Sequence, residues 1–149
     1  MQKLLTIVIP TYNMQDYLHR CLDSLVLEDE QLMSQLEVLV INDGSKDNSS
    51  TIAHDYENKY PATFRVIDKE NGNYGSCINK GLEIATGKYV KVLDADDSFD
   101  TSNFEDYLRF LNSVEVDILH RTCVGFEART VVVIVELKRP NSLVFIFRC

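Results

Sequence analysis

The chain has 149 residues and a formal net charge of −8; 45% of its residues are hydrophobic and 26% are charged. This length and composition suit one soluble globular domain, and an acidic chain without a basic cluster argues against nucleic acid as a partner. No apolar stretch approaches the ~20 residues that span a bilayer, and no convincing targeting segment is present. The four cysteines lack C-x-x-C spacing, so we expect reduced thiols in a cytoplasmic protein rather than a zinc or redox site.

Strands and helices are expected to alternate from the first residues onward. The β-branched run 5–9 indicates a buried strand. Asn13 is placed to cap the helix that follows, in which apolar residues recur with helical spacing. Glu37–Ile41 predicts a second strand, which the polar turn 42–45 ends.

The same alternation continues through the middle of the chain. A helix is expected from about Ser50 until Pro61 ends it, and a third strand is expected at 64–67. A glycine-bearing loop, 70–75, then leads into another helix, for which Gly87 is placed as the C′ residue.

The fourth expected strand is Tyr89–Leu93, and the acidic motif Asp94–Asp97 follows it directly. Thr101 or Ser102 is expected to cap the next helix, and 116–119 predicts a fifth strand. Strands separated by helices of this length imply right-handed βαβ units and a three-layer α/β/α fold with a mainly parallel sheet. In such sheets ligands bind at the carboxyl ends of the strands.

The acidic motif places Asp94, Asp96 and Asp97 within four positions. Two carboxylates ~4 Å apart repel by roughly 4 kcal/mol at an effective dielectric of ~20, so protonation, a basic partner or a divalent cation must offset the repulsion. Alternation at a strand end would put Asp94 and Asp96 on one side, which favours a metal site for a phosphorylated ligand. The alternative is a solvated turn in which Asp and Ser cap the next helix.

Four sequence blocks, in this order, resemble family-2 glycosyltransferases. They are 6–13 (TIVIPTYN), 40–45 (VINDGS), 70–81 (from ENG to NKG) and 92–97 (VLDADD), and the resemblance covers residues 4–119. It implies a nucleotide-diphospho-sugar transferase (Rossmann-like) type of fold.

The resemblance also implies roles for particular residues. Tyr12 would stack on the nucleobase, and Asp43 would accept a hydrogen bond from the imide N–H of a uracil or thymine ring. Asp94 would hold the ribose hydroxyls or share a metal, and Asp96 would bind Mg²⁺ or Mn²⁺ that bridges the diphosphate oxygens. The full set implied for donor-nucleotide binding is Pro10, Thr11, Tyr12, Asp43, Asn71, Asn79 and Asp94.

The sequence departs from the family pattern in two places. Many family members carry an arginine where this chain has Ile78, so part of the phosphate-facing charge is missing or comes from Lys69 or Lys80. Family members also carry an acceptor-binding half with a carboxylate general base. After the last expected strand only Glu127 and Glu136 are acidic, and neither stands in a context resembling that motif, so no general base is identified.

The last thirty residues differ from the rest in composition. We expect residues 1–119 to form a nucleotide-sugar-binding α/β domain and 120–149 to form a divergent, β-prone segment of the same domain. The runs 130–135 and 142–147 are compatible with a hairpin, a sheet edge or an aggregation-prone tail. The change predicts a C-terminally incomplete fold, as in a chain that ends early or departs from its ancestral frame.

The leading hypothesis is a metal-dependent, inverting glycosyltransferase, or its donor-binding portion. It would use a nucleotide-diphospho-sugar, with a UDP-sugar favoured, and an unidentified saccharide, lipid or protein acceptor. It would lie in the cytoplasm, where peripheral contact with the inner face of the cell membrane is compatible with the resemblance. The alternatives are a non-catalytic nucleotide-diphosphate-binding module, or a truncated relic that lacks the general base. A further alternative is a chain that folds poorly because its sheet is incomplete. A nucleotidyltransferase is disfavoured because no glycine-rich, basic loop follows the first strand.

Overall fold

The computed structural model describes residues 3–113, 118–120 and 133–136. In chain order the elements are β1 (Leu5–Thr11), α1 (Gln15–Asp23), α2 (Glu30–Gln35), β2 (Leu36–Asn42), α3 (Ser49–Lys59), β3 (Phe64–Asp68), α4 (Tyr74–Ile84), β4 (Tyr89–Val92), α5 (Thr101–Ser113), β5 (Ile118–His120) and β6 (Val133–Glu136).

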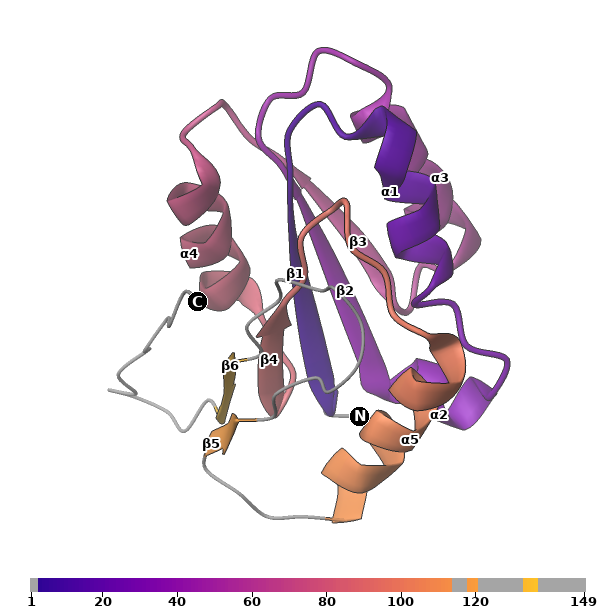
Figure 1. The fold of residues 1–149 in the computed structure, drawn as a ribbon. Helices are drawn as coiled ribbons and strands as arrows, with labels where there is room; N and C mark the ends of the chain where they lie inside the picture. Colours follow the sequence, from indigo (N-terminus) through magenta and orange to yellow (C-terminus); the bar gives the residue numbers. More distant parts are fainter. Residues whose placement is uncertain (1–2, 114–117, 121–132, 137–149) are drawn as a thin grey trace.

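The strands form one sheet in the order β3-β2-β1-β4-β6-β5 (Figure 1). Strands β1 to β4 pair in parallel, whereas β6 pairs antiparallel with both β4 and β5. All residues of β1 and β2 are buried, which explains why these central parallel strands read as nearly continuous apolar runs. Pro10 is tolerated in β1 because it lies beyond Val8, the last residue of β1 in register with β4.

Helices cover both faces of the sheet (Figure 1). Apolar side chains of α1, α2, α3 and α5 join one core cluster with residues such as Ile7 and Val38. Helix α4 packs on the opposite face, against Val8 and Leu39 among others. The expected three-layer α/β/α architecture with a mainly parallel sheet is therefore confirmed.

Gly81 permits the close approach of α4 to the sheet. A Cβ atom at this position would lie 2.3 Å from Val8 Cγ1, a separation that real atoms do not reach. Helix α4 therefore lies directly on β1, and its first residue, Tyr74, is carried to the carboxyl edge of the sheet.

Several predicted helix boundaries are wrong. Asn13 does not cap α1, because its φ is +53° and Met14 precedes the first helical residue. Asp100, rather than Thr101 or Ser102, caps α5: its side chain accepts a hydrogen bond from the Asn103 N–H at 3.0 Å. The side chain of Asn13 instead accepts from the Lys46 N–H in the neighbouring loop, a bond of the kind that competes with capping. For α5 the cap lies just before the predicted positions.

Two further differences concern α2 and Gly87. The short helix α2 was not predicted, although Asp29 caps it by accepting from the N–H groups of Gln31 and Leu32. Gly87 is not the C′ residue of α4, since Ala85 follows the helix directly. Its lack of a side chain is required instead by the sheet, because a Cβ there would lie 2.6 Å from the Thr6 nitrogen.

The C-terminal segment is described only in part. Strand β6 overlaps the β-prone run 130–135 and extends one residue beyond it. It is paired on both sides, by β4 and by β5, so it is an inner strand and not a sheet edge. Strand β5 was predicted at 116–119 and is observed two residues later at its start. The run 142–147 and Glu127 lie outside the described residues. The division at residue 119 stays a prediction.

Two observations bear on thiols and membranes. Cys21 and Cys77 are free and buried, and burial raises the pKa of the Cys21 thiol to about 12. None of the helices in the described part of the chain is long and apolar enough to cross a bilayer.

Candidate functional site

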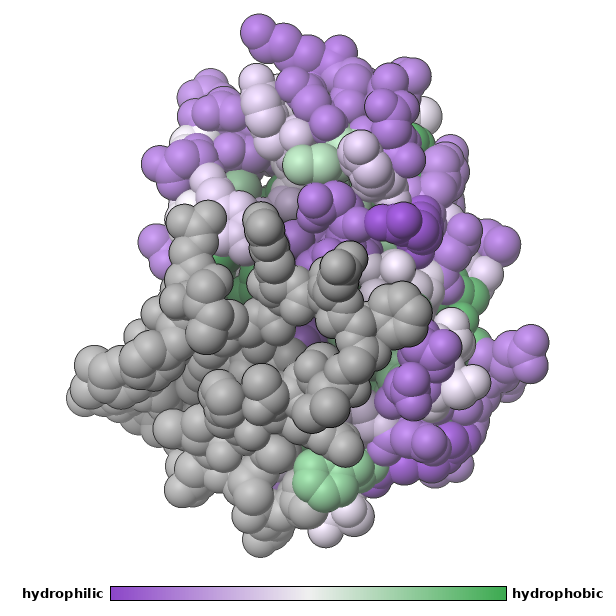
Figure 2. Space-filling model, viewed as in Figure 1, coloured by the Kyte–Doolittle hydropathy of each residue, from purple (hydrophilic) through white to green (hydrophobic). Residues whose placement is uncertain are grey.

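The parallel strands end at one edge of the sheet, and most of the predicted site residues follow those ends. Pro10 and Thr11 close β1 and are buried, whereas Tyr12 follows them with 44% of its surface exposed. Asp43 directly follows β2. The surface around the loops after β1 and β2 is hydrophilic, as the upper part of Figure 2 shows.

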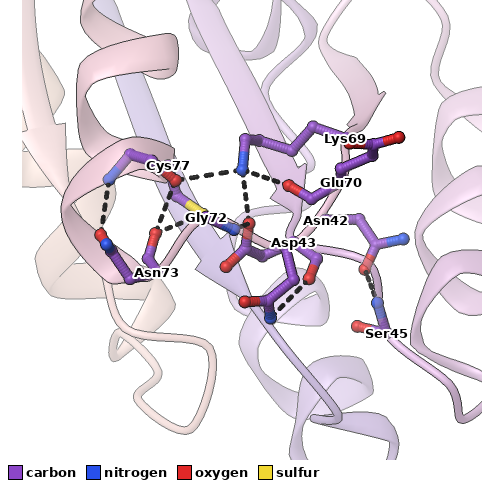
Figure 3. Close-up of polar contacts among 10 residues, drawn as sticks. Asn42, Asp43, Ser45, Lys69, Glu70, Gly72, Asn73 and Cys77 are labelled. Atoms are coloured by element: carbon purple, nitrogen blue, oxygen red, sulfur yellow. Dashed lines mark hydrogen bonds and ion pairs between the residues drawn. The ribbon is translucent and has the colours of Figure 1, made fainter.

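Asp43 is buried and is hydrogen-bonded through both its side chain and its backbone (Figure 3). Its side chain is 4% exposed, and its Oδ1 atom accepts from Lys69 Nζ at 2.5 Å and from the Gly72 N–H at 2.9 Å. Its backbone is fixed as well, because its N–H donates to Thr11 O at 2.8 Å and its carbonyl accepts from Asn71 Nδ2 at 3.1 Å. The end of β2 is thus joined to β1 and to the loop before α4.

The electrostatics favour the charged form of Asp43. Burial by itself raises the pKa of this carboxyl, but the hydrogen bonds from the Lys69 ammonium and the Gly72 N–H outweigh burial, and the net result is a lowered pKa. Asp43 is therefore an ionised hydrogen-bond acceptor at neutral pH.

Both lysines that were considered as alternative sources of phosphate-facing charge have protein partners. Lys69 Nζ also donates to Glu70 O at 2.6 Å and to Ser76 Oγ at 3.0 Å. Lys80 pairs with Glu83 at 3.1 Å on the exposed side of α4. For Lys69, the three ammonium donors already have three acceptors, which favours the other alternative, that part of the phosphate-facing charge is missing.

The loops after β1 and β2 are bound to each other side by side. Asn13 N donates to Ser45 Oγ at 3.0 Å, and Lys46 N donates back to Asn13 Oδ1 at 2.8 Å. Further bonds of the same kind join Gln15 N to Asp47 Oδ2 at 3.0 Å and Asn48 N to Gln15 Oε1 at 3.1 Å, and Met14 N to Ser49 Oγ at 2.8 Å. Reciprocal bonds of this kind fix the backbone that carries Tyr12.

A second polar cluster supports β2 from the side of β3. Asp68 Oδ1 accepts from Asn42 Nδ2 at 2.6 Å, and Asn42 Oδ1 accepts from the Ser45 N–H at 3.2 Å. His54 of α3 lies between two carboxylates, with Nε2 2.8 Å from Asp68 Oδ2 and Nδ1 2.8 Å from Glu57 Oε2. These hydrogen bonds raise the pKa of His54.

The acidic motif forms a turn and not the end of a strand. Strand β4 ends at Val92, and the Asp97 N–H donates to Asp94 O at 3.0 Å, so the predicted strand alternation is not what separates the carboxylates. Ala95 is 2% exposed and Asp96 is exposed, so the turn buries Ala95 and leaves Asp96 accessible to solvent.

Two residues that were not predicted contact this turn. Tyr74 Oη, from the start of α4, donates to Asp94 Oδ1 at 2.5 Å. Arg20 Nη2, from α1, donates to Asp96 O at 2.6 Å. Neither contact has a signal in the sequence, because each depends on how a helix packs against the sheet. Within the described residues Asp94 and Asp96 form no ion pair.

The donor set of the turn suits a hard cation. In the described ranges no group of three or more His, Cys, Asp or Glu side chains is arranged to hold a metal. Mg²⁺, however, is commonly bound through one or two carboxylates together with phosphate oxygens of a substrate. Asp94 and Asp96 provide two such carboxylates at the sheet edge, so the residues present fit a cation that a ligand helps to coordinate.

The remaining candidates are Asn71 and Asn79, which differ in their contacts with the rest of the site. Asn71 contacts the Asp43 carbonyl, as described above. Asn79 is exposed on α4, and no hydrogen bond within the described residues joins it to the other candidate residues.

Comparison with known proteins identifies a family. The family model described as Glycosyl transferase family 2 matches residues 6–132. The uncharacterized glycosyltransferase MG025 of Mycoplasma genitalium is 43% identical over 109 residues, which make up 72% of this chain and 36% of that protein. The chain spans about a third of the length of such curated relatives.

Solved structures give the same result. Residues 1–349 of TarS from Staphylococcus aureus, crystallised with UDP, align with a TM-score of 0.72 and 28% identity over 86% of this chain and 38% of that one. The mannosyltransferase PcManGT from Pyrobaculum calidifontis, in complex with GDP-Man and Mn²⁺, aligns with a TM-score of 0.70 and 22% identity over 85% and 36%; at this identity the likeness shows the fold alone. The expected type of fold is confirmed.

Proposed function

Because the chain belongs to glycosyl transferase family 2, we propose that it binds a nucleotide-diphospho-sugar, a UDP-sugar first of all, at the carboxyl edge of its sheet. The observation that carries the proposal is the buried, ionised carboxylate of Asp43 at that edge. The likeness to TarS, which was crystallised with UDP, supports the choice of nucleotide. In the whole protein, the sugar would pass to a saccharide, lipid or protein acceptor with inversion at the anomeric carbon.

The nucleoside would lie over the ends of β1 and β2. Tyr12 lies beside the loops after β1 and β2 that are hydrogen-bonded to each other. Its aromatic ring is partly exposed, so a base can stack on it. Asp43 would accept the imide N–H of uracil through the oxygen that Lys69 and Gly72 leave available. Pro10, Thr11 and Asn71 would contribute through the shape of the backbone, and Asn79 would lie at the margin of the site.

The diphosphate would lie toward the end of β4. Asp94 and Asp96 would hold Mg²⁺ or Mn²⁺, and Asp94 would also meet the ribose hydroxyls. When bound, the cation would neutralise charge that develops on the leaving diphosphate. The Tyr74 hydroxyl now bonded to Asp94 would have to share that carboxylate with the ligand. The complex of PcManGT with Mn²⁺ supports a divalent cation in this fold.

The first test is a calorimetric titration of UDP into the 149-residue chain with Mn²⁺ and then with EDTA. We expect binding that requires the metal and that Asp96→Asn abolishes. Asp55→Asn, an exposed change on α3, is the matched control and should bind as the wild type does. A folded wild-type protein that binds no UDP in the presence of Mn²⁺ would contradict the proposal.

A second candidate is a binding module without transfer activity. It is favoured by one observation: the candidate side chains placed at the sheet edge in the described part of the chain, such as Asp43 and Asp94, are those that would bind the nucleotide. A transfer assay with UDP-sugars and simple saccharide acceptors separates the two candidates. Turnover would support the transferase, whereas metal-dependent UDP binding without transfer or hydrolysis would support the binding module.

A further inference from the structure

Lys69 lies between three parts of the site and contacts each of them (Figure 3). Its ammonium donates to Asp43 Oδ1 after β2, to the Glu70 carbonyl in the loop before α4, and to Ser76 Oγ in the first turn of α4. The space around it is filled, since a Cβ added at Gly72 would lie 3.0 Å from Lys69 Nζ. The side chain is 23% exposed. This placement limits its freedom to turn toward a ligand.

The contacts of Lys69 divide the two oxygens of Asp43. Oδ1 receives two protein donors, the Lys69 ammonium and the Gly72 N–H, and this pair fixes the plane of the carboxylate. Oδ2 accepts from neither of these two donors, so it is the oxygen that would meet the N–H group of a ligand. The other titratable group that faces Asp43 is Cys77 of α4, whose thiol hydrogen-bonds the carboxylate and stays neutral because burial raises the thiol pKa. Lys69 is thus the charged partner that keeps Asp43 ionised.

An ionised carboxylate accepts hydrogen bonds and cannot donate them. It therefore suits a base edge that presents an N–H group, as uracil does at N3, and it disfavours cytosine, whose N3 is an acceptor. A protonated Asp43 would instead carry one O–H donor, which cytosine N3 can accept. The protonation state of this one carboxyl thus decides which pyrimidine edge matches.

We infer that Lys69 is a positioning residue that determines base specificity: by fixing Asp43 as an oriented, ionised acceptor, it makes the site select uracil over cytosine. This inference rests on the proposed donor-binding function. It assigns to Lys69 a role apart from phosphate binding, and it accounts for the convergence of three acceptors on one ammonium group.

The experiment measures the affinity of the full chain for UDP and for CDP, with Mn²⁺, between about pH 5.5 and pH 8. Phosphate ionisation is common to both ligands, so the ratio of the two affinities reports on the base alone. For the wild type we expect a preference for UDP that changes little with pH. For Lys69→Met we expect UDP affinity to fall, because Asp43 Oδ1 loses the ammonium donor that orients and charges this carboxylate, and we expect the preference for UDP over CDP to shrink as the pH falls.

Two variants separate positioning from simple loss of structure. Lys69→Arg keeps the charge and should restore most of the UDP preference at low pH. Lys80→Met removes a neighbouring lysine that pairs only with Glu83 among the described contacts, and it should leave both affinities unchanged. If Lys69→Met does not fold, ¹³C NMR titration of the Asp43 carboxyl in the wild type provides the answer, and protonation of that carboxyl above about pH 5 would overturn the inference.

The outcomes for the two proposals are distinguishable. If the wild type binds UDP, and Lys69→Met keeps the same preference for UDP at every pH, the role of Lys69 is refuted and the donor site stands. If the wild type binds neither nucleotide, the proposed function fails before any variant is examined, and the specificity role fails with it.

Discussion

Acidic residues follow both β2 and β4 at the sheet edge, but the surroundings of their carboxylates differ. Asp43, after β2, is 4% exposed and has an ammonium and a backbone N–H on one oxygen. Asp96, after β4, is exposed, and its one described contact is through its backbone carbonyl, to Arg20. The first carboxylate is compensated by protein groups in the absence of a ligand, whereas the second is left to solvent.

This difference suggests separate roles for the two strand ends: the β2 end would recognise ligand donors, and the β4 end would bind a cation. A group that must recognise a fixed pattern of donors gains from being oriented in advance, because less ordering is required when the ligand arrives. Carboxylates intended for a cation gain from the opposite arrangement, since protein cations beside them would compete with the metal. If this interpretation holds, mutations at the β2 end should affect folding as well as binding, and mutations at the β4 end should affect binding alone.

The largest expected effect is that of Asp43→Ala. It removes the partner of a mostly buried ammonium and leaves the Gly72 N–H without its acceptor, which should lower the free energy of unfolding by about 2–3 kcal/mol. Urea denaturation measures the change. The double variant Asp43→Ala/Lys69→Met should recover part of the loss, because the uncompensated charge is gone. Equal stability of the single variant and the wild type would contradict the view that the β2 end contributes to folding.

A smaller and pH-dependent effect is expected for His54→Gln, which tests the support that β2 receives through Asp68. The hydrogen bonds to Asp68 and Glu57 raise the pKa of His54, so its contribution is complete below the unfolded value of 6.5 and is lost as the pH rises through the folded value. Since His54 and Asp68 are 42% and 50% exposed, screening limits the contribution to less than about 1 kcal/mol.

Denaturation curves of the wild type and His54→Gln at about pH 5.5 and about pH 9 check this sign. The two proteins should differ at the lower pH and converge at the higher one. Asp68 behaves in the opposite sense: burial raises its pKa, but hydrogen bonds from Asn42 and His54 outweigh burial and lower it, so its contribution is lost only in acid. A difference that grew with pH would contradict the assignment of a charged His54 between two carboxylates.

The smallest effect on stability is expected for Asp96→Asn. An exposed side chain without an ion pair in the described structure should change the free energy of unfolding by no more than about 0.5 kcal/mol, with a slight gain at low salt because one of three neighbouring negative charges is removed. Thermal unfolding without metal measures it. A loss comparable to that of Asp43→Ala would show that the acidic turn is a structural element and would remove the contrast between the two strand ends.

The sequence predicts the sheet well because its inner strands are buried on both faces. The runs that form β1 and β2 are apolar nearly throughout, and this pattern is hard to satisfy in any other element of that length. The positions of Tyr12, Asp43 and Asp94 follow from the same reasoning, since residues after parallel strands gather at one edge. The sequence therefore predicts which polar side chains gather at the carboxyl edge of the sheet.

The partners of these groups were less accessible to prediction. Lys69 was considered only as one possible source of phosphate-facing charge, and its contact with Asp43 from the end of the neighbouring strand β3 was not predicted. A lysine has a long flexible side chain, and sequence gives no information on which of several nearby acceptors it will choose. Tyr74 and Arg20 reach the acidic turn from helices, so their contacts depend on packing that local patterns do not specify.

The order of strands in the sheet has a consequence for how the chain folds. β1 is joined to β2 through α1 and α2, and β3 follows after α3. The other side of β1 is completed only when β4 arrives much later in the chain, with Leu5 opposite Tyr89. Until then one edge of the central strand has unsatisfied backbone groups, and closing this long loop slows folding. We expect the partly folded chain to be most prone to aggregation at that stage, and a chaperone that shields the unpaired β1 edge to raise the yield of folded protein.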